Sequence, residues 1–231
     1  MSILGGVLRQ LSAHLRPDPQ QFLGHVSGVV HVGANTGQER LVYEQHGLNV
    51  LWIEPIPSIY ETLLANIKPF PRQRACQALI TDRHDTEQQF HISNNDGRSS
   101  SILELKHHAD IWPTVNYSAS ITLRSITLEA LFKKEAINPA DYGALIMDTQ
   151  GSELMVLQGS IPLLKGFEYI KTEVSDFESY AGCCQLADIQ AFMKRHGYAE
   201  VWRQKFADRP QGGGYYDVTY RKKALRRMFR R

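Results

Sequence analysis

The sequence predicts an α/β domain with a mostly parallel sheet, an antiparallel edge at its C-terminal end and helices on both faces. Short apolar runs alternate with segments of helical composition along most of the chain, as in parallel strands joined by crossover helices. The last two β-rich segments are separated only by a glycine-rich turn, which predicts a hairpin. The length of 231 residues suits one such domain.

The first half of the chain begins with a helical lead that prolines interrupt. Three β-rich runs and two helical segments then alternate: strands are expected at 29–32, 50–55 and 76–81, and helices at 38–46 and 58–67. Ser58 is expected to cap the second helix, with Glu61 as its partner in a capping box. This order predicts βαβ units whose strands lie side by side.

The pattern weakens from Asp82 to about Thr122, where QFHIS alternates like a strand and NNDGRSSS reads as a polar loop. After it, strands are expected at 120–126, 143–148 and 167–175, and helices from about Thr127, at 152–161 and at 186–196. Gly197 closes the last helix, and the segments YAEVWRQ and YYDVTYRKK form the final hairpin around glycines 212–214.

Composition and charge narrow the class of protein. Hydrophobic residues make up 42% and charged residues 22%, which excludes a largely disordered chain, a coiled coil or a collagen. No apolar run is long enough to span a membrane, and the first residues do not resemble a secretory signal. The three cysteines, two of them adjacent, do not form a disulfide framework. We therefore expect reduced thiols and a cytoplasmic location.

The basic residues are unevenly distributed. The last eleven residues, RKKALRRMFRR, hold seven basic side chains and no acid, so the rest of the chain is net acidic. We therefore divide the chain into a helical lead (1–20), one domain (21–220) and a basic tail (221–231). A basic amphipathic tail is able to rest on an anionic membrane, and a solvated terminus is the alternative. The acidic body argues against a nucleic acid partner.

A glycine-containing turn follows the first expected strand. Gly33, Asn35 and Gly37 lie between this strand and a helix, and Glu54 ends the next strand. Glycines permit close approach of a ligand to the backbone, and a carboxylate at that place is able to accept both ribose hydroxyls. The turn lacks the third glycine of a dinucleotide fingerprint, which favours a smaller nucleoside such as S-adenosylmethionine. A purely structural turn is the alternative.

Several segments together resemble the FkbM family of S-adenosylmethionine-dependent O-methyltransferases. The resemblance is carried by VVHVGANTGQE, LWIEPIPSIYETLLAN, ALITD, SSSIL, IMDTQGSELMVLQGS and IKTEVS, in this order and spacing over about residues 29–198. It implies a Rossmann-like class I methyltransferase sheet. It also implies methyl transfer to a hydroxyl group, on a sugar or a secondary metabolite.

The resemblance assigns roles to residues of this chain. The GAN turn of the family falls on Gly33, Ala34, Asn35 and Gly37, and the acid of its E-P segment falls on Glu54. Its D-x-E-G-x-E segment falls on Asp148, Gln150, Gly151 and Glu153, and the acid near the end of the next strand falls on Glu173. The predicted cofactor-binding residues are Gly33, Ala34, Asn35, Gly37, Glu54, Asp82 and Asp148, with Asp82 beside the adenine amino group. The predicted substrate-binding residues are Ser100, Gln150 and Glu173.

The chain departs from the family at two positions. His31 stands where the family has an acid before the turn, and Gln150 stands where it has an acid beside a glycine. The acceptor hydroxyl must lose a proton, and an imidazole or a carboxylate is able to take it. We predict His31, Asp148 and Glu173 as the catalytic residues. Asp148 and Glu173 also form a candidate Mg²⁺ site, because hard carboxylate oxygens suit this ion.

Two other functions are compatible with the same residues. A nicotinamide-dependent oxidoreductase uses a similar sheet, although the third glycine is missing here. A non-catalytic nucleoside-binding protein would keep a degenerate pocket, and His31 and Gln150 favour it. The expected partner is a small molecule or glycan acceptor, and the oligomeric state is not predicted.

Overall fold

The computed structural model describes residues 19–224. A seven-stranded sheet has the order β3-β2-β1-β7-β8-β10-β9, in which β1, β2, β3, β7 and β8 are parallel. The antiparallel pairs β8–β10 and β10–β9 form one edge. The strands of this sheet are β1 (Gly28–Val32), β2 (Asn49–Glu54), β3 (Gln73–Gln77), β7 (Ala144–Met147), β8 (Tyr169–Ser175), β9 (Tyr198–Asp208) and β10 (Gly214–Lys222). The predicted parallel sheet with an antiparallel C-terminal hairpin is confirmed.

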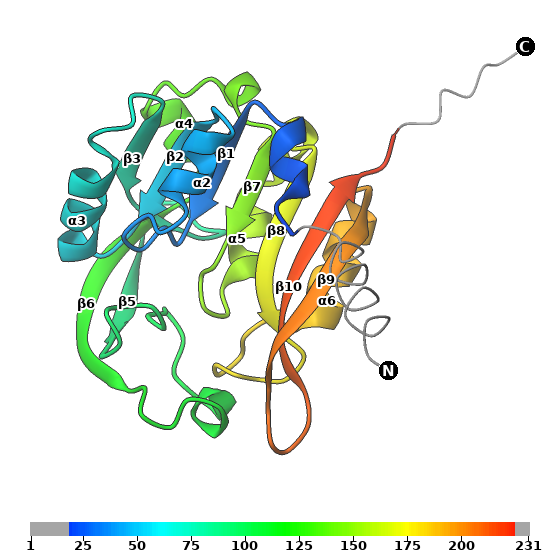
Figure 1. Cartoon of the computed structure of the whole chain (residues 1–231). Helices are drawn as coiled ribbons and strands as arrows, with labels where there is room; N and C mark the ends of the chain where they lie inside the picture. Colours follow the sequence, from blue (N-terminus) through cyan, green and yellow to red (C-terminus); the bar gives the residue numbers. More distant parts are fainter. Residues whose placement is uncertain (1–18, 225–231) are drawn as a thin grey trace, which may run out of the picture.

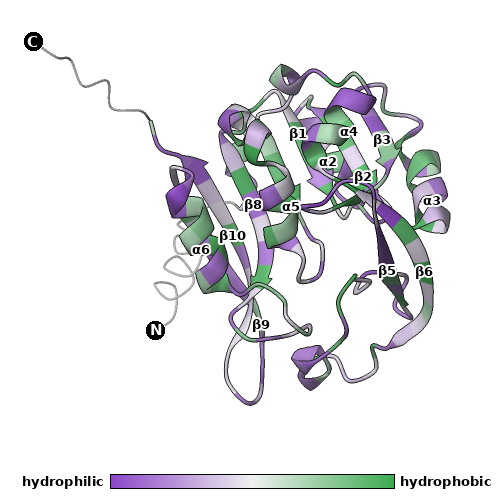
Figure 2. Cartoon of the chain, turned by 180° about the vertical axis from the view of Figure 1, so that it is seen from behind, coloured by the Kyte–Doolittle hydropathy of each residue, from purple (hydrophilic) through white to green (hydrophobic). Residues whose placement is uncertain are grey.

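Helices cover both faces, as predicted (Figures 1 and 2). One face packs against η1 (Gln21–His25), α2 (Arg40–Gln45) and α3 (Pro57–Ile67) through a core that includes Leu23, Tyr43 and Trp52. The other face packs against α4 (Leu128–Lys134), α5 (Glu153–Gly159), η4 (Ile161–Gly166) and α6 (Leu186–Arg195). The buried strands β1, β2 and β7 are nearly continuous apolar runs because both of their faces are covered.

A second sheet occupies the segment where the sequence pattern weakens. The strands β4 (Leu79–Ile80), β6 (Tyr117–Ile126) and β5 (Thr86–Ser93) form this three-stranded sheet in the order β4-β6-β5. The expected strand 76–81 is therefore divided between the two sheets. The loop between β5 and β6 contains η2 (His107–Asp110), and η3 (Pro139–Asp141) precedes β7. Figure 1 shows the β5–β6 loop and the β9–β10 hairpin extending beyond the carboxyl ends of the parallel strands.

Helix ends are predicted correctly at one position and wrongly at another. The Thr127 side chain accepts a hydrogen bond of 3.2 Å from the Ala130 N–H, so Thr127 caps α4 as its position before the helix predicts. Ser58 does not cap α3. Pro57 already occupies the first turn because its fixed φ suits that position, and Ile56 is the N-cap residue without a side-chain cap.

Three observations concern other predictions. All three cysteines are free, as expected. Within residues 19–224, no helix has the length and apolarity needed to cross a bilayer. The helical lead falls almost wholly outside the described residues, and of the basic tail only residues 221–224 fall within them, so both remain predictions.

Candidate active site

The turn after β1 is built around backbone conformations that glycine tolerates best. Gly33 and Gly37 have φ angles of 81° and 72°, and Asn35 between them has a φ of 44°. A Cβ atom on Gly33 would lie 1.9 Å from the backbone oxygen of Asp148, so no other residue fits there without displacing that strand end. The N–H groups of Gly33 and Ala34 donate to the Ile53 carbonyl, which joins the turn to β2.

Glu54 ends β2 and is held by this turn. Its Oε2 accepts from the Asn35 N–H at 2.9 Å, and its Oε1 accepts from the Ile56 N–H at 2.9 Å. Burial raises the pKa of the Glu54 carboxyl to about 7, although both hydrogen bonds oppose this shift. The structure thus fixes a buried carboxylate beside the predicted turn, with lone pairs left for a ligand.

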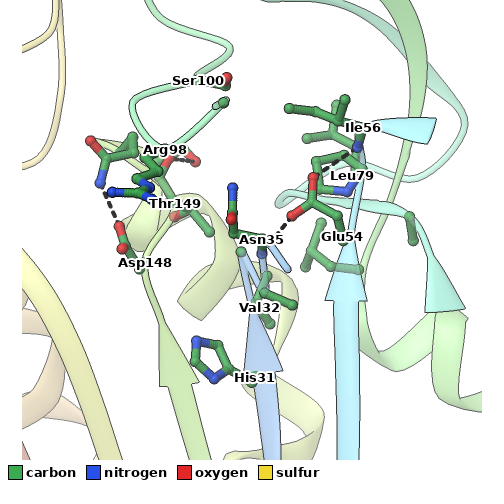
Figure 3. A pocket seen from close by; sticks show the side chains of 18 of the residues that line it. His31, Val32, Asn35, Glu54, Ile56, Leu79, Arg98, Ser100, Asp148 and Thr149 are labelled. Atoms are coloured by element: carbon green, nitrogen blue, oxygen red, sulfur yellow. Dashed lines mark hydrogen bonds between the residues drawn. The ribbon is translucent and has the colours of Figure 1, made fainter. Parts of the chain in front are cut away.

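A cavity of about 340 Å³ lies over the carboxyl ends of β1, β2 and β7. Figure 3 shows Glu54, Ile56 and Leu79 on one side of it, and Arg98, Asp148 and Thr149 on the other. The first side is otherwise apolar, with contributions from Ala78, Ile80 and Phe90. The volume and the mixture of apolar walls with few polar groups are typical of a small-molecule site. We call these two sides the turn side and the acid side.

The acid side is organised by Gln150. Its Nε2 donates to Asp148 Oδ1 at 2.5 Å and lies 3.4 Å from Glu173 Oε1, while its Oε1 accepts from the Tyr180 hydroxyl at 2.6 Å. Because Tyr180 fixes the amide oxygen, the NH₂ group faces the two carboxyls. A glutamate at this position has no such donor when ionised. Gln150 therefore bridges the two acids without adding a third negative charge.

The two acids bridged by Gln150 influence one another's protonation. Burial raises the pKa of Asp148 to about 7, and the Gln150 hydrogen bond opposes the shift. Burial, followed by repulsion from Asp148, raises the pKa of Glu173 well above its ordinary value. The pair thus retains a proton near neutral pH and is able to exchange it with a ligand.

Glu153 serves the backbone of this region. Its Oε1 accepts from the N–H groups of Thr149 and Gly151, at 2.9 and 3.1 Å, and from the Thr149 hydroxyl. Glu153 is 2% exposed and does not line the cavity. It therefore stabilises the turn between β7 and α5 that carries Asp148 and Gln150.

His31 lies beneath the cavity in the middle of the sheet. Its ring is stacked on Trp52 with centroids 5.0 Å apart, and its Nδ1 lies 3.1 Å from the Tyr43 hydroxyl. Burial lowers the pKa of His31; the charge of Glu39 opposes this shift and the charge of Lys171 adds to it. The lowered pKa favours the neutral imidazole at physiological pH. His31 lines the cavity, as does Asp148, and its role as a base stays a prediction.

The loop between β5 and β6 covers the cavity. The backbone oxygen of Asp96 in this loop accepts a hydrogen bond from Asn35 Nδ2, at a distance of 3.1 Å. Ser100, predicted to bind substrate, lines the cavity, but its Oγ also accepts from the Ser93 N–H at 3.0 Å. Ser101 donates to the Gln150 carbonyl at 2.8 Å. The serines thus attach the loop to the acid side.

Two expectations find no support in this geometry. Asp82 does not line the cavity, because β3 ends at Gln77 and β4 brings Leu79 and Ile80 to the wall instead. The placement of Asp82 beside an adenine group therefore has no support in the cavity lining and stays a prediction. Among residues 19–224, no group of three or more His, Cys, Asp or Glu side chains is arranged to hold a metal ion. The Mg²⁺ site at Asp148 and Glu173 lacks a third ligand of these types.

The structure brings together most of the other predicted residues. The residues that line the cavity are Gly33, Ala34, Asn35, Glu54, His31, Asp148, Gln150 and Ser100. Gly37 does not line it and packs near Leu63 instead, and Glu173 reaches it only through Gln150. Sequence reasoning missed Glu39 and Arg98, which also line it. Arg98 lies in the polar loop that the sequence marks, but no local pattern places that loop over the cavity.

Comparisons with known proteins agree with this arrangement. The family model described as the methyltransferase FkbM domain matches residues 31–199. Among curated proteins, no sequence matches the chain.

Solved structures resemble the chain in fold. A candidate tRNA (m1A22) methyltransferase of Streptococcus pneumoniae, in complex with S-adenosyl-L-methionine, has a TM-score of 0.52 and 10% identity. The match covers 90% of this chain and 72% of that one. A magnesium protoporphyrin IX methyltransferase of Synechocystis PCC 6803 has a TM-score of 0.49 and 8% identity, and the match covers 95% and 81%. The predicted Rossmann-like class I methyltransferase sheet is thus confirmed.

Proposed function

This chain belongs to the FkbM methyltransferase family, and we propose that it transfers a methyl group from S-adenosylmethionine to a hydroxyl group of a sugar or secondary metabolite. The observation that carries the proposal is Glu54, a buried carboxylate fixed by two backbone N–H groups at the wall of a cavity. A carboxylate at this place accepts hydrogen bonds from the two hydroxyls of a ribose.

The residues around the first cavity fit the whole cofactor. On the turn side, Ile56, Leu79 and Phe90 offer apolar contacts to an adenine ring next to Glu54. On the acid side, Asp148 suits the ammonium group of the methionine part, and Arg98 suits its carboxylate. A ligand with a neutral nucleoside at one end and a zwitterion at the other matches this distribution of charge.

When bound, S-adenosylmethionine supplies a methyl group on a sulfonium, which reacts with an oxygen nucleophile without activation of the leaving group. The protein must then orient the acceptor hydroxyl and accept its proton. Glu173, whose pKa is raised by burial and by the charge of Asp148, acts as the base when ionised, and the charge of Asp148 makes it more basic. His31 is a second acceptor for the proton, since its neutral imidazole lies at the same wall.

Calorimetric titration with S-adenosylmethionine tests the proposal. We expect saturable binding by the wild-type protein, weakened by about 1–3 kcal/mol in Glu54→Ala because buried ribose hydroxyls lose their acceptor. The control is Glu61→Ala, which removes an exposed carboxylate from α3. No binding by the folded wild-type protein would overturn the proposal, as would equal binding by Glu54→Ala.

Family membership favours methyl transfer over the oxidoreductase alternative. A parallel titration with NADH checks this, and we expect no saturation. Turnover of S-adenosylmethionine to S-adenosylhomocysteine with a hydroxylated acceptor separates an enzyme from the non-catalytic alternative. The nature of the acceptor, the cytoplasmic location and contact of the basic tail with a membrane stay predictions.

A further inference from the structure

A second cavity lies next to the first one, on the sheet face that carries η1 and α2. It has a volume of about 230 Å³, and it shares three lining residues with the first cavity: His31, Glu39 and Asp148. These residues thus stand at the boundary between the two spaces. Two molecules bound in the two cavities would meet at this boundary, as a methyl donor and its acceptor must.

The floor of the second cavity is a row of polar side chains on neighbouring strands. Asp217 of β10 pairs in register with Glu173 of β8, and Asp148 follows the last paired residue of β7 beside Glu173. Neighbouring strands are about 4.8 Å apart, so the three carboxyl groups form a line along the sheet edge. Lys171 stands two residues before Glu173 on the same face, with its Nζ 3.4 Å from Asp217 Oδ1.

The opposite wall is apolar. Phe22 and Leu23 of η1 and Tyr43 of α2 line it, and all three are at most 7% exposed. The Phe22 ring also lies against Tyr169, with centroids 5.5 Å apart, which fixes its position. The second cavity therefore combines a floor of hydrogen-bonding groups with an aromatic wall. A saturated ring with hydroxyls on its edge and C–H groups on its face fits both surfaces.

Charge further restricts the ligand. The titratable groups facing the second cavity are His31 of β1, Glu39 next to α2, Asp148, Lys171, Glu173 and Asp217. Acids outnumber bases, and Lys171 is already paired with Asp217. A phosphate or carboxylate on the ligand would be repelled by the remaining acids at short range. The raised pKa values of Asp148 and Glu173 leave both donors and acceptors of hydrogen bonds on the floor, as uncharged hydroxyls require.

We infer that the second cavity is the acceptor site and that it takes an uncharged cyclic polyol, such as a neutral sugar. The inference rests on the proposed function; it places the acceptor in a named cavity and narrows it from a sugar or secondary metabolite to an uncharged cyclic polyol. It also gives Asp217 and Lys171 a role in binding that the sequence motifs do not assign. Glu173, the middle residue of the line, then contacts the hydroxyl that reacts or its neighbour.

Saturation-transfer NMR with simple probes tests the inference. The probes are methyl α-D-glucopyranoside, methyl α-L-rhamnopyranoside and myo-inositol, with glucose 6-phosphate as the charged comparison. Each is added to the full chain in the presence of saturating S-adenosylhomocysteine, whose own binding is measured calorimetrically in the same preparation. The variants are Asp217→Asn, which alters the floor, and Asp208→Asn, which removes a carboxylate from the exposed end of β9.

We expect saturation transfer to at least one neutral probe, a reduction of about five-fold or more in Asp217→Asn, and no change in Asp208→Asn. Glucose 6-phosphate is expected to give no signal. If S-adenosylhomocysteine binds but no neutral probe does, or if the phosphorylated sugar binds equally well, the inference is overturned and the proposed function stands. Equal losses in the two variants also overturn it. Failure of S-adenosylhomocysteine itself to bind refutes the proposed function instead.

Discussion

The turn side and the acid side of the first cavity are stabilised in different ways. On the turn side, Glu54 is held by the N–H groups of Asn35 and Ile56, which belong to backbone segments at the ends of adjacent strands. On the acid side, Gln150 is oriented by Tyr180, which lies thirty residues away and beyond β8. The first arrangement follows from the sheet itself. The second depends on side chains that loops bring together, and it bridges the carboxyl groups of Asp148 and Glu173 through one amide.

The difference shows that the position of one acid is fixed by the backbone, whereas the protonation of the other two depends on nearby side chains. The strands determine where the Glu54 carboxylate lies, so its position cannot shift without moving them. A pair of acids bridged by an amide changes its protonation with each neighbouring charge. We therefore expect substitutions of the turn residues to affect folding most, and substitutions on the acid side to have smaller effects. Glu54 and Gln150 each make stability depend on pH, Glu54 through its own burial and Gln150 through the two acids that it contacts.

The largest effect is expected from Gly33→Ala. The new Cβ would lie 1.9 Å from the Asp148 backbone oxygen at a φ of 81°, so β7 or the turn must shift. We expect a loss of about 4 kcal/mol in the free energy of unfolding, measured by urea denaturation. Gly182→Ala is the control, because φ there is 70° with no neighbouring atom, and only about 1 kcal/mol is expected. Similar losses of unfolding free energy in both variants would show that the contact between residue 33 and the Asp148 backbone oxygen does not determine the cost.

The second-largest expected effect is the pH dependence that Glu54 gives to the free energy of unfolding. Its pKa is about 7 in the folded protein and about 4.5 when unfolded, so folding favours the protonated form. The associated stability is present below pH 4.5 and is lost as the pH rises through 7. Between these values, the stability of the wild-type protein relative to Glu54→Gln should fall by about 3 kcal/mol. Parallel stability curves for the two proteins would contradict the raised pKa.

On the acid side, Gln150→Glu is expected to destabilise this chain. It replaces the donor to Asp148 and Glu173 by a third carboxyl group. We expect a cost of about 2 kcal/mol at pH 8, with a smaller cost at pH 5 where the acids are protonated. The control is Gln190→Glu, which also replaces an amide donor to a carboxylate by a carboxyl group, but at the exposed pair Gln190–Glu200. A pH-independent cost in Gln150→Glu would argue against coupling of these acids.

The smallest expected effect concerns Arg98, which is about two-thirds exposed. Arg98→Ala should weaken binding of S-adenosylmethionine by about 1 kcal/mol, since the pair with the cofactor carboxylate is largely solvated. Binding of 5′-methylthioadenosine, which lacks the amino acid part, should not change. Calorimetry of both ligands on both proteins measures the difference. If Arg98→Ala weakens binding of both ligands equally, Arg98 does not contact the carboxylate of the cofactor.

The two sides also differ in how far the sequence predicts them. The glycine turn and Glu54 each follow an apolar strand, so the sheet necessarily brings them to one edge, and both are found there. Arg98 reaches the cavity, and Tyr180 reaches Gln150, through loops whose course depends on long-range contacts, such as the bridge between Leu105 and Tyr180. Asp82 does not line the cavity for a related reason: the chain leaves the main sheet at Ala78 to begin a second one, which no local periodicity reveals.

The central claim is that Glu54 and the glycine turn form the nucleoside-binding half of this cavity. A crystal structure of the protein with S-adenosylhomocysteine tests it most directly. We predict that both ribose hydroxyls donate to the Glu54 carboxylate, with the adenine between Ile56 and Leu79 and the amino acid part toward Asp148. A ligand bound in another cavity, or a ribose out of contact with Glu54, would contradict the account.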